Sequence, residues 1–205
     1  MSVYDVQMES IDGAVDFMQQ FDGKVTLVVN IVSKLGYTPQ CSTFWSFGRT
    51  TRQLWQLQQV HDEFKDRGFS VIGFPCNQFG QMEPCENAEI SAWIKQTYPF
   101  VNFPLSEKID VNGKNGSMVY SALLGNVTRI KDASPADTSE AAYQGWNKAG
   151  GVVARIPHSW EKFVVGRSGQ MLTRFNWQSD PLDAVPLTTG ESWTIRECID
   201  EVLDY

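Results

Sequence analysis

Two nearly uninterrupted apolar stretches predict the centre of a β-sheet. Residues 24–32 read KVTLVVNIV, and residues 69–74 read FSVIGF. Such runs are typical of strands that are buried on both faces. Between them, apolar residues recur at helical spacing over residues 54–66, and Arg67 and Gly68 end this predicted helix. The order strand, helix, strand predicts a parallel pair with a right-handed crossover.

The remaining pattern predicts shorter elements on either side of this unit. They are an opening strand, two helices and a hairpin, over residues 3–8, 87–97, 117–124 and 160–175. Thr188 and Glu191 have capping-box spacing before a last amphipathic helix. Cys198 lies on the apolar stripe of that helix, so we expect it in the core as a small hydrophobic residue.

Two segments lack a clear period and are interpreted as loop insertions, at about residues 39–53 and 125–152. Long loops are uncommon in compact domains unless they serve a purpose. We expect a single domain over residues 1–205, with an α/β thioredoxin-like fold. Its central mixed β-sheet is flanked by helices and interrupted by the two insertions.

Composition excludes several classes of protein. The chain has 205 residues, 42% of them hydrophobic, and a formal net charge of −7. This is enough apolar material for one core, and the acidic balance disfavours nucleic-acid binding and docking on anionic membranes. No segment approaches the length of a membrane span, and the first residues do not resemble a signal or transit peptide. The expected location is cytoplasmic.

The four cysteines are irregularly spaced, at Cys41, Cys76, Cys85 and Cys198. A zinc site would need a tighter cluster with histidine partners, and the chain has only two histidines. We therefore expect reduced thiols, no metal and no cofactor.

Three motifs together resemble the glutathione peroxidase family. Residues 29–38 read VNIVSKLGYT, residues 74–84 read FPCNQFGQMEP, and residues 160–169 read WEKFVVGRSG. The resemblance extends from about Val3 to Leu203. It implies a chain that reduces hydroperoxides through a thiolate or selenolate.

The resemblance also assigns four catalytic places, and this sequence differs at each of them. Leu35 stands where the family has its cysteine or selenocysteine, and Met82 stands where it has glutamine. His158 and Ser159 stand where it has a tryptophan and an asparagine. Leucine has no ionisable proton, so the four changes predict a divergent member without the catalytic tetrad. The family's resolving cysteine would fall near Lys95, where there is none.

Three other thiols are candidates for a relocated nucleophile. Cys41 lies in the first insertion, Cys76 lies within the second motif, and Cys85 follows Pro84 at a predicted helix start. A helix N-terminus lowers the pKa of a thiol. The structural interpretation is favoured for all three. Cys76 belongs to the loop scaffold of its motif, the position of Cys85 carries no role in the family, and no paired base is visible beside Cys41. His158 is likewise interpreted as a structural, hydrogen-bonded histidine, with a role as base or metal ligand left open.

Both insertions carry aromatic residues that are candidates for binding a partner. Phe44, Trp45 and Phe47 lie in the first, and Tyr143 and Trp146 in the second. Exposed aromatic residues on loops need something to pack against, either their own domain or a partner. The first cluster therefore either fills the altered site above Leu35 or anchors another protein.

Two functions remain open. The first is a catalytically inactive structural or interaction subunit of a larger assembly, cytoplasmic and attached to a cytoskeletal or other large structure, with protein partners but no direct contact to nucleic acid or membrane. The alternative is a thiol-dependent hydroperoxide reductase that uses a relocated cysteine, with glutathione or a thioredoxin-like protein as its reductant.

Overall fold

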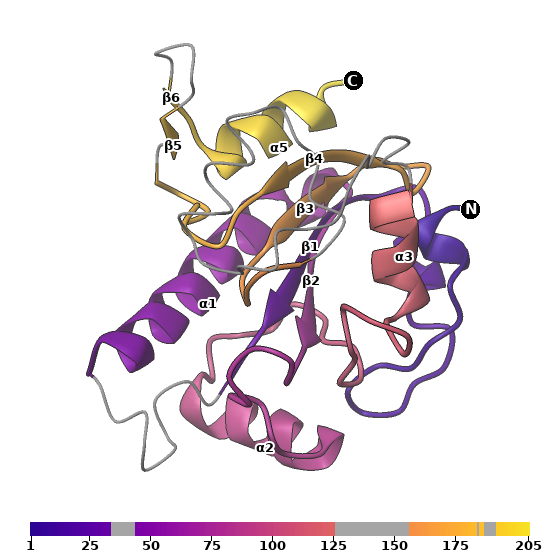
Figure 1. Cartoon of the computed structure of the whole chain (residues 1–205). Coiled ribbons are helices and arrows are strands. Elements are labelled where there is room, and N and C mark those ends of the chain that lie inside the picture. Colours follow the sequence, from indigo (N-terminus) through magenta and orange to yellow (C-terminus); the bar gives the residue numbers. More distant parts are fainter. Residues whose placement is uncertain (34–43, 126–155, 184, 187–191) are drawn as a thin grey trace.

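The sheet at the centre of the computed structural model is mixed, as expected. The structure describes residues 1–33, 44–125, 156–183, 185–186 and 192–205. Its four-stranded sheet has the order β2-β1-β3-β4 (Figure 1). β1 (Val25–Ile31) pairs in parallel with β2 (Phe69–Pro75) and antiparallel with β3 (Lys162–Val165). β3 pairs antiparallel with β4 (Met171–Phe175), which confirms the predicted hairpin. A second, two-stranded sheet joins β5 (Val185–Pro186) to β6 (Ser192–Trp193).

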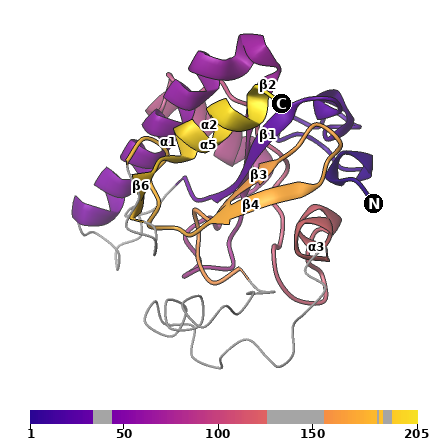
Figure 2. The ribbon, with the colours of Figure 1, turned by 90° about the horizontal axis from the view of Figure 1, so that it is seen from above.

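Helices cover both faces of the four-stranded sheet (Figure 2). α1 (Phe44–Phe64) and α5 (Ile195–Leu203) pack on one face, and α3 (Met118–Gly125) packs on the other with the 3₁₀ turn η1 (Val3–Asp5). Because both faces are covered, every residue of β1 is buried, and the same holds for β2. This explains why neither strand alternates between apolar and polar residues.

Two hydrophobic clusters form the core, one on each face. The first joins Leu27 and Val29 of β1 to Leu54 and Leu57 of α1, and it also includes Cys198. The second joins Val28 of β1 to residues of β2, β3 and α3, chiefly Ile72, Phe163 and Tyr120. The assignment of Cys198 to the core is confirmed, since its side chain is buried against this first cluster.

α1 begins earlier than the apolar pattern indicates. The helix was expected from residue 54, and it starts at Phe44, so most of the predicted first insertion is helical. The inward face of this extra part is polar: Thr50 and Gln53 are fully buried, and Arg49 donates to the carbonyl of Trp177 at 2.7 Å. A period of apolar residues cannot reveal a helix whose buried contacts are polar. The helix is continued by η3 (Lys65–Arg67) and ends at Gly68, whose φ of 81° favours glycine.

Two further expectations about the chain ends are wrong. The opening segment forms η1 instead of a strand, because the Ser2 hydroxyl accepts the Tyr4 amide and the Asp5 carboxylate accepts the Ser2 amide. α5 is capped by Thr194 and Glu197, a second capping box six residues after the predicted one. Thr188 and Glu191 lie outside the described residues.

The two middle helices agree with the sequence pattern. α2 spans Asn87–Thr97, the range expected, and α3 lies within one residue of its expected position. Another short turn, η2 (Gln19–Phe21), precedes β1. The second predicted insertion lies almost wholly outside the residues that the structure describes, so its loop character stays a prediction, as does the single-domain organisation over 1–205.

Candidate functional site

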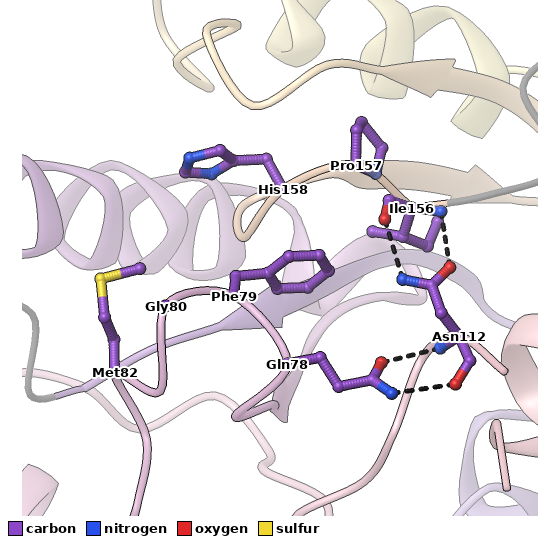
Figure 3. A pocket seen from close by; sticks show the side chains of 8 residues that line it. All are labelled: Gln78, Phe79, Gly80, Met82, Asn112, Ile156, Pro157 and His158. Carbon is purple, nitrogen blue, oxygen red and sulfur yellow. Dashed lines mark hydrogen bonds between the residues drawn. The ribbon is translucent and has the colours of Figure 1, made fainter. Parts of the chain in front are cut away.

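A cavity of about 550 Å³ opens at the edge of the sheet where β1 and β2 end and β3 begins. Parallel strands end at the same edge, and β3 runs antiparallel to β1, so the chain segments after β2 and before β3 must meet there. The lining residues come from the loop after β2, from Asn112 and from the segment before β3: Gln78, Phe79, Gly80, Met82, Asn112, Ile156, Pro157 and His158 (Figure 3). Met82 and His158, two of the sequence-predicted positions, therefore share one cavity.

Amide side chains hold the walls of this cavity together. The Gln78 carbonyl oxygen accepts the backbone amides of Val111 and Asn112 at 2.9 Å each, and its amide group donates to the Asn112 carbonyl at 2.9 Å. Asn112 in turn donates to the Ile156 carbonyl at 2.8 Å and accepts the Ile156 amide at 2.9 Å. Figure 3 shows this ladder as a continuous row of bonds. These hydrogen bonds hold three separate chain segments in fixed positions relative to one another.

The loop that carries Met82 is anchored from below by a buried carboxylate. Glu83 is fully buried, and its carboxylate accepts both the amide and the hydroxyl of Ser33, directly after β1. The Glu83 amide donates to Asn77 at 2.9 Å. Trp93 of α2 donates from its indole to the Ser33 carbonyl at 3.2 Å. Both donors of Ser33 and its carbonyl are therefore engaged, which fixes the position of the chain where β1 leaves the sheet.

The segment before β3 is held by Asn30 of β1. The fully buried Asn30 side chain donates to the His158 carbonyl at 2.9 Å and accepts the Glu161 amide at 2.9 Å. The Trp160 amide donates to the Asn30 carbonyl at 2.7 Å, and Trp160 has a φ of 72°. Left-handed backbone is unusual for an aromatic residue, and the bonds from Asn30 on both sides sustain it here.

His158 lies in a column of stacked groups. Its imidazole is stacked on Phe79, with ring centroids 6.3 Å apart and planes at 7°, and on Trp177, at 4.7 Å and 21°. The Arg49 guanidinium lies 4.4 Å from the centroid of the Trp177 ring on α1's side. The imidazole Nδ1 lies 3.1 Å from the Ser159 carbonyl oxygen. His158 is thus hydrogen-bonded, as the structural interpretation expected, and it also lines the cavity.

Ser159 and the residues after it turn into the protein. The Ser159 side chain is buried, and its hydroxyl has no hydrogen-bond partner among the described residues. Glu161 is fully buried and forms an ion pair with Arg174 at 2.9 Å. Lys162 is also fully buried, and its ammonium donates to the Trp160 carbonyl at 2.8 Å. Burial lowers the pKa of Lys162 to about 7, although the nearby carboxylates of Glu161 and Asp180 oppose this.

Cys76 and Cys85 stand at the two ends of the cavity loop. Cys76 is fully buried, its sulfur lies 4.0 Å from the Gln78 carbonyl oxygen, and burial raises the pKa of its thiol. Cys85 is partly exposed and packs against the first core cluster together with Met82 and Trp93. Cys198 lies in the core, where burial raises its pKa to about 11. Among the cysteines that the structure describes, Cys85 alone combines exposure with proximity in sequence to the cavity wall.

Several predicted positions lie outside the described residues. These are Leu35, Cys41, Tyr143 and Trp146. The backbone of Phe44, Trp45 and Phe47 belongs to the first turn of α1, but their side chains also lie outside what the structure describes. The proposed packing of Leu35 and the partner-binding roles of the aromatic residues therefore stay predictions.

Sequence reasoning missed the residues that organise the site. Gln78 and Asn112 build the ladder, and Arg49 and Trp177 complete the column on His158. Gln78 lies within the second family motif, residues 74–84, so the motif could have pointed to it as a site residue. Arg49 and Trp177 are 128 residues apart and meet only through the fold.

Neither a metal site nor a membrane span is found in the described part of the chain. Within it, no three His, Cys, Asp or Glu side chains are grouped to hold a metal ion. The helices described there are all too short or too polar to cross a membrane.

Comparison with known proteins confirms the resemblance seen in the motifs. The family model described as "Glutathione peroxidase" matches residues 3–124. The chain is 32% identical to glutathione peroxidase-like peroxiredoxin 2 of Saccharomyces cerevisiae, over 88% of this chain and 90% of that protein. It is 33% identical to thioredoxin/glutathione peroxidase BtuE of Escherichia coli, over 90% and 92%. It is also 33% identical to hydroperoxy fatty acid reductase gpx1 of Synechocystis, over 88% and 89%.

Solved structures confirm the thioredoxin-like α/β fold. The crystal structure of Trgpx in apo form superposes with a TM-score of 0.61 at 24% identity, covering 100% of this chain and 97% of that one. The crystal structure of T. cruzi GPX1 gives a TM-score of 0.58 at 20% identity, covering 99% and 95%.

The relatives overturn the first of the two functions drawn from the sequence. That prediction, an inactive structural or interaction subunit, is wrong: relatives about one-third identical along nearly the whole chain are named as peroxidases, peroxiredoxins or a hydroperoxide reductase. The four substituted positions are a small part of the chain, and the similarity to these relatives extends over about nine-tenths of it.

Proposed function

Because the chain belongs to the glutathione peroxidase family, we propose that it is a thiol-dependent hydroperoxide reductase. One observation carries the proposal: the match to peroxidase relatives runs along about nine-tenths of both chains. The cavity supports it, because the loop after β2 and the segment before β3 form a pocket of about 550 Å³, large enough for a small organic hydroperoxide.

We further propose that the reactive sulfur is not at the place which the family resemblance assigns to it. That place is Leu35, and a leucine side chain offers no lone pair for attack on an O–O bond. Cys76 and Cys198 are poor candidates, because both are buried and burial raises the pKa of each thiol. The proposed nucleophiles are therefore Cys85, which is partly exposed, and Cys41.

The proposed chemistry passes through a sulfenic acid. The thiolate attacks one oxygen of the hydroperoxide, so that an S–O bond forms, the O–O bond breaks, and the departing alkoxide takes up a proton to give an alcohol. Two equivalents of a small thiol such as glutathione, or one thioredoxin-like dithiol, then reduce the sulfenic acid to the thiol; the reductant is oxidised to its disulfide and water is released. The proposed partner is thus a reductant; protein partners beyond it, and attachment to a cytoskeletal or other assembly, stay predictions.

Hydroperoxide consumption by the purified full-length chain tests the proposal. We expect turnover of tert-butyl hydroperoxide with glutathione or with a thioredoxin system, followed through NADPH oxidation by the coupled reductase. Cys85→Ser or Cys41→Ser should abolish this turnover. Cys198→Ser is the matched control, since it removes a core thiol and should leave the rate unchanged.

Two results would contradict the proposal. One is a wild-type chain, shown to be folded by circular dichroism, that consumes no peroxide with either reductant. The other is turnover that survives replacement of all four cysteines by serine, since it would have to come from a contaminant or from a group other than a thiol.

A further inference from the structure

Met82 brings a thioether sulfur to the wall of the cavity. It is one of the lining residues, whereas none of the three described cysteines lines the cavity. Figure 3 shows the Met82 side chain pointing away from its loop, toward the segment that carries His158. A hydroperoxide that enters this cavity therefore meets the sulfur of Met82.

The thioether is held in place without being covered by the neighbouring residue Gly80. A Cβ atom added to Gly80 would lie 3.9 Å from the Met82 sulfur and 3.7 Å from its terminal methyl group. A larger side chain there would run along the thioether, but the φ of 66° at Gly80 favours glycine. Met82 also packs against the first core cluster, and the buried bonds of Glu83 to Ser33 anchor the next residue. The sulfur is thus partly buried, in a fixed place at the cavity wall.

The rest of the lining suits the organic part of a hydroperoxide. Phe79, Ile156 and Pro157 are apolar, and the amide groups of Gln78 and Asn112 are hydrogen-bonded within the ladder. An apolar wall favours an alkyl or aryl group. Its reactive oxygen would then lie in the same small space as the thioether.

A thioether differs from a thiol in what it needs for reaction. A thiol attacks an O–O bond only as the thiolate, so it depends on a lowered pKa or on a base. A thioether has no proton to lose, and its lone pair is available at any pH. Oxidation by two electrons converts methionine to its sulfoxide, which reductases can reverse. Met82 therefore requires no partner residue in order to react.

We propose that Met82 is an oxygen acceptor of this cavity, and that an organic hydroperoxide bound there oxidises its thioether to the sulfoxide. The inference rests on one part of the proposed function, the entry of a hydroperoxide into the cavity, and does not require the thiol cycle. The sulfur lone pair attacks the terminal peroxide oxygen, so that an S–O bond forms as the O–O bond breaks. The proton of that oxygen passes to the departing alkoxide, which leaves as the alcohol.

This step oxidises the sulfur by two electrons and reduces the hydroperoxide by two. The product carries a polar oxygen at the place where the family has the glutamine amide. Oxidation of Met82 therefore converts an apolar part of the cavity wall into a hydrogen-bond acceptor.

Other methionines of the chain separate this proposal from oxidation by simple exposure. Met1 is 73% exposed and Met118 is 55% exposed, whereas Met18 is fully buried. Met82 is only partly exposed. If exposure alone set the order, Met118 would be oxidised before Met82. If the cavity binds the hydroperoxide, the order is reversed.

Peptide mass spectrometry of the full-length chain, incubated with tert-butyl hydroperoxide and no reductant, measures this order through the gain of about 16 Da at each methionine. We expect Met82 to react at least about tenfold faster than Met118, a small part of what orientation within a site can supply. The rate at Met82 should saturate as the hydroperoxide concentration rises, while the rate at Met118 should rise linearly. Met118→Leu is the control variant and should leave the rate at Met82 unchanged. In the urea-unfolded chain, the two methionines should react at equal rates.

Two results would overturn the proposal. One is a Met82 that reacts no faster than Met118 in the folded chain. The other is a rate at Met82 that rises linearly with hydroperoxide concentration, since it would show that nothing is bound before the reaction. Thiol-dependent turnover in the same preparation would then leave the proposed function standing. Fast, saturable oxidation of Met82 without thiol-dependent turnover would instead refute the thiol cycle and support this inference.

Discussion

Lys162 places a titrating ammonium in the core, and its replacement by methionine should change how stability depends on pH. The Lys162 side chain is fully buried, and burial lowers its pKa from the usual 10.5 to about 7. The unfolded chain therefore binds a proton at Lys162 throughout the range between these values, whereas the folded chain mostly does not. Stability must rise with pH across that range, because the unfolded state holds more protons.

The magnitude follows from the two pKa values. The unfavourable contribution of Lys162 to folding amounts to about 4 kcal/mol at pH 7 and about 2 kcal/mol at pH 9, at about 1.4 kcal/mol for each pKa unit. Lys162→Met removes this contribution but leaves the Trp160 carbonyl without its donor, which costs about 1–3 kcal/mol at either pH. The cost of leaving the Trp160 carbonyl without a donor is the same at both pH values, so it cancels when the two are compared. The stability advantage of the variant should therefore be about 2 kcal/mol larger at pH 7 than at pH 9.

Urea denaturation of both chains at pH 7 and pH 9, followed by tryptophan fluorescence, measures this difference. Other groups that titrate in this range affect both chains equally and drop out of the comparison. Lys114→Met is a matched control, since Lys114 is exposed and should give the same difference from wild type at both pH values. A Lys162→Met effect that does not change with pH would refute the reasoning, because it would mean that the lysine keeps its ordinary pKa when folded.

Three further outcomes are expected. Asn30→Ala should destabilise the chain by about 2–4 kcal/mol in urea, because two backbone groups before β3 lose their buried partner; a loss below 0.5 kcal/mol would mean that water replaces the amide. Thr194→Ala should cost about 1 kcal/mol through loss of the α5 cap, while Thr194→Ser should be nearly neutral. In the native chain, iodoacetamide followed by peptide mass spectrometry should label Cys85 well before Cys198, since Cys198 lies in the core; equal rates would contradict the burial of Cys198.

The sequence pattern predicted those elements whose buried surface is apolar. The continuous runs of β1 and β2 and the stripe on α5 are of this kind, and all three were located correctly. The first part of α1 is different, because its buried contacts are polar. They involve Arg49 and Gln53 of the helix and Asp180 from the segment after β4. In the sequence, polar residues such as Arg49 and Gln53 are more typical of a loop. The η1 turn was taken for a strand because Val3 and Tyr4 are apolar in either conformation, and the Ser2 cap decides between them.

The candidate site was predictable only in part, for a related reason. Motif comparison identified Met82 and His158, and the structure brings both to one cavity. The bonds that hold the His158 segment join residues far apart in the sequence, such as Asn30 to His158 and Arg49 to Trp177, each pair 128 positions apart. No local pattern encodes such a contact, since it depends on the order of the strands in the sheet.

The bond between Ser33 and Glu83 has a consequence for how this protein could have diverged. Replacing Glu83 alone would leave the buried amide and hydroxyl of Ser33 without this acceptor, and replacing Ser33 alone would remove the hydroxyl that the Glu83 carboxylate accepts; each lost bond costs about 1–3 kcal/mol. A lineage that replaces one of these residues alone would pass through a poorly folded intermediate. Across related chains, the two positions should therefore be inherited as a unit, either both retained or both exchanged, even where the residues around them have drifted freely.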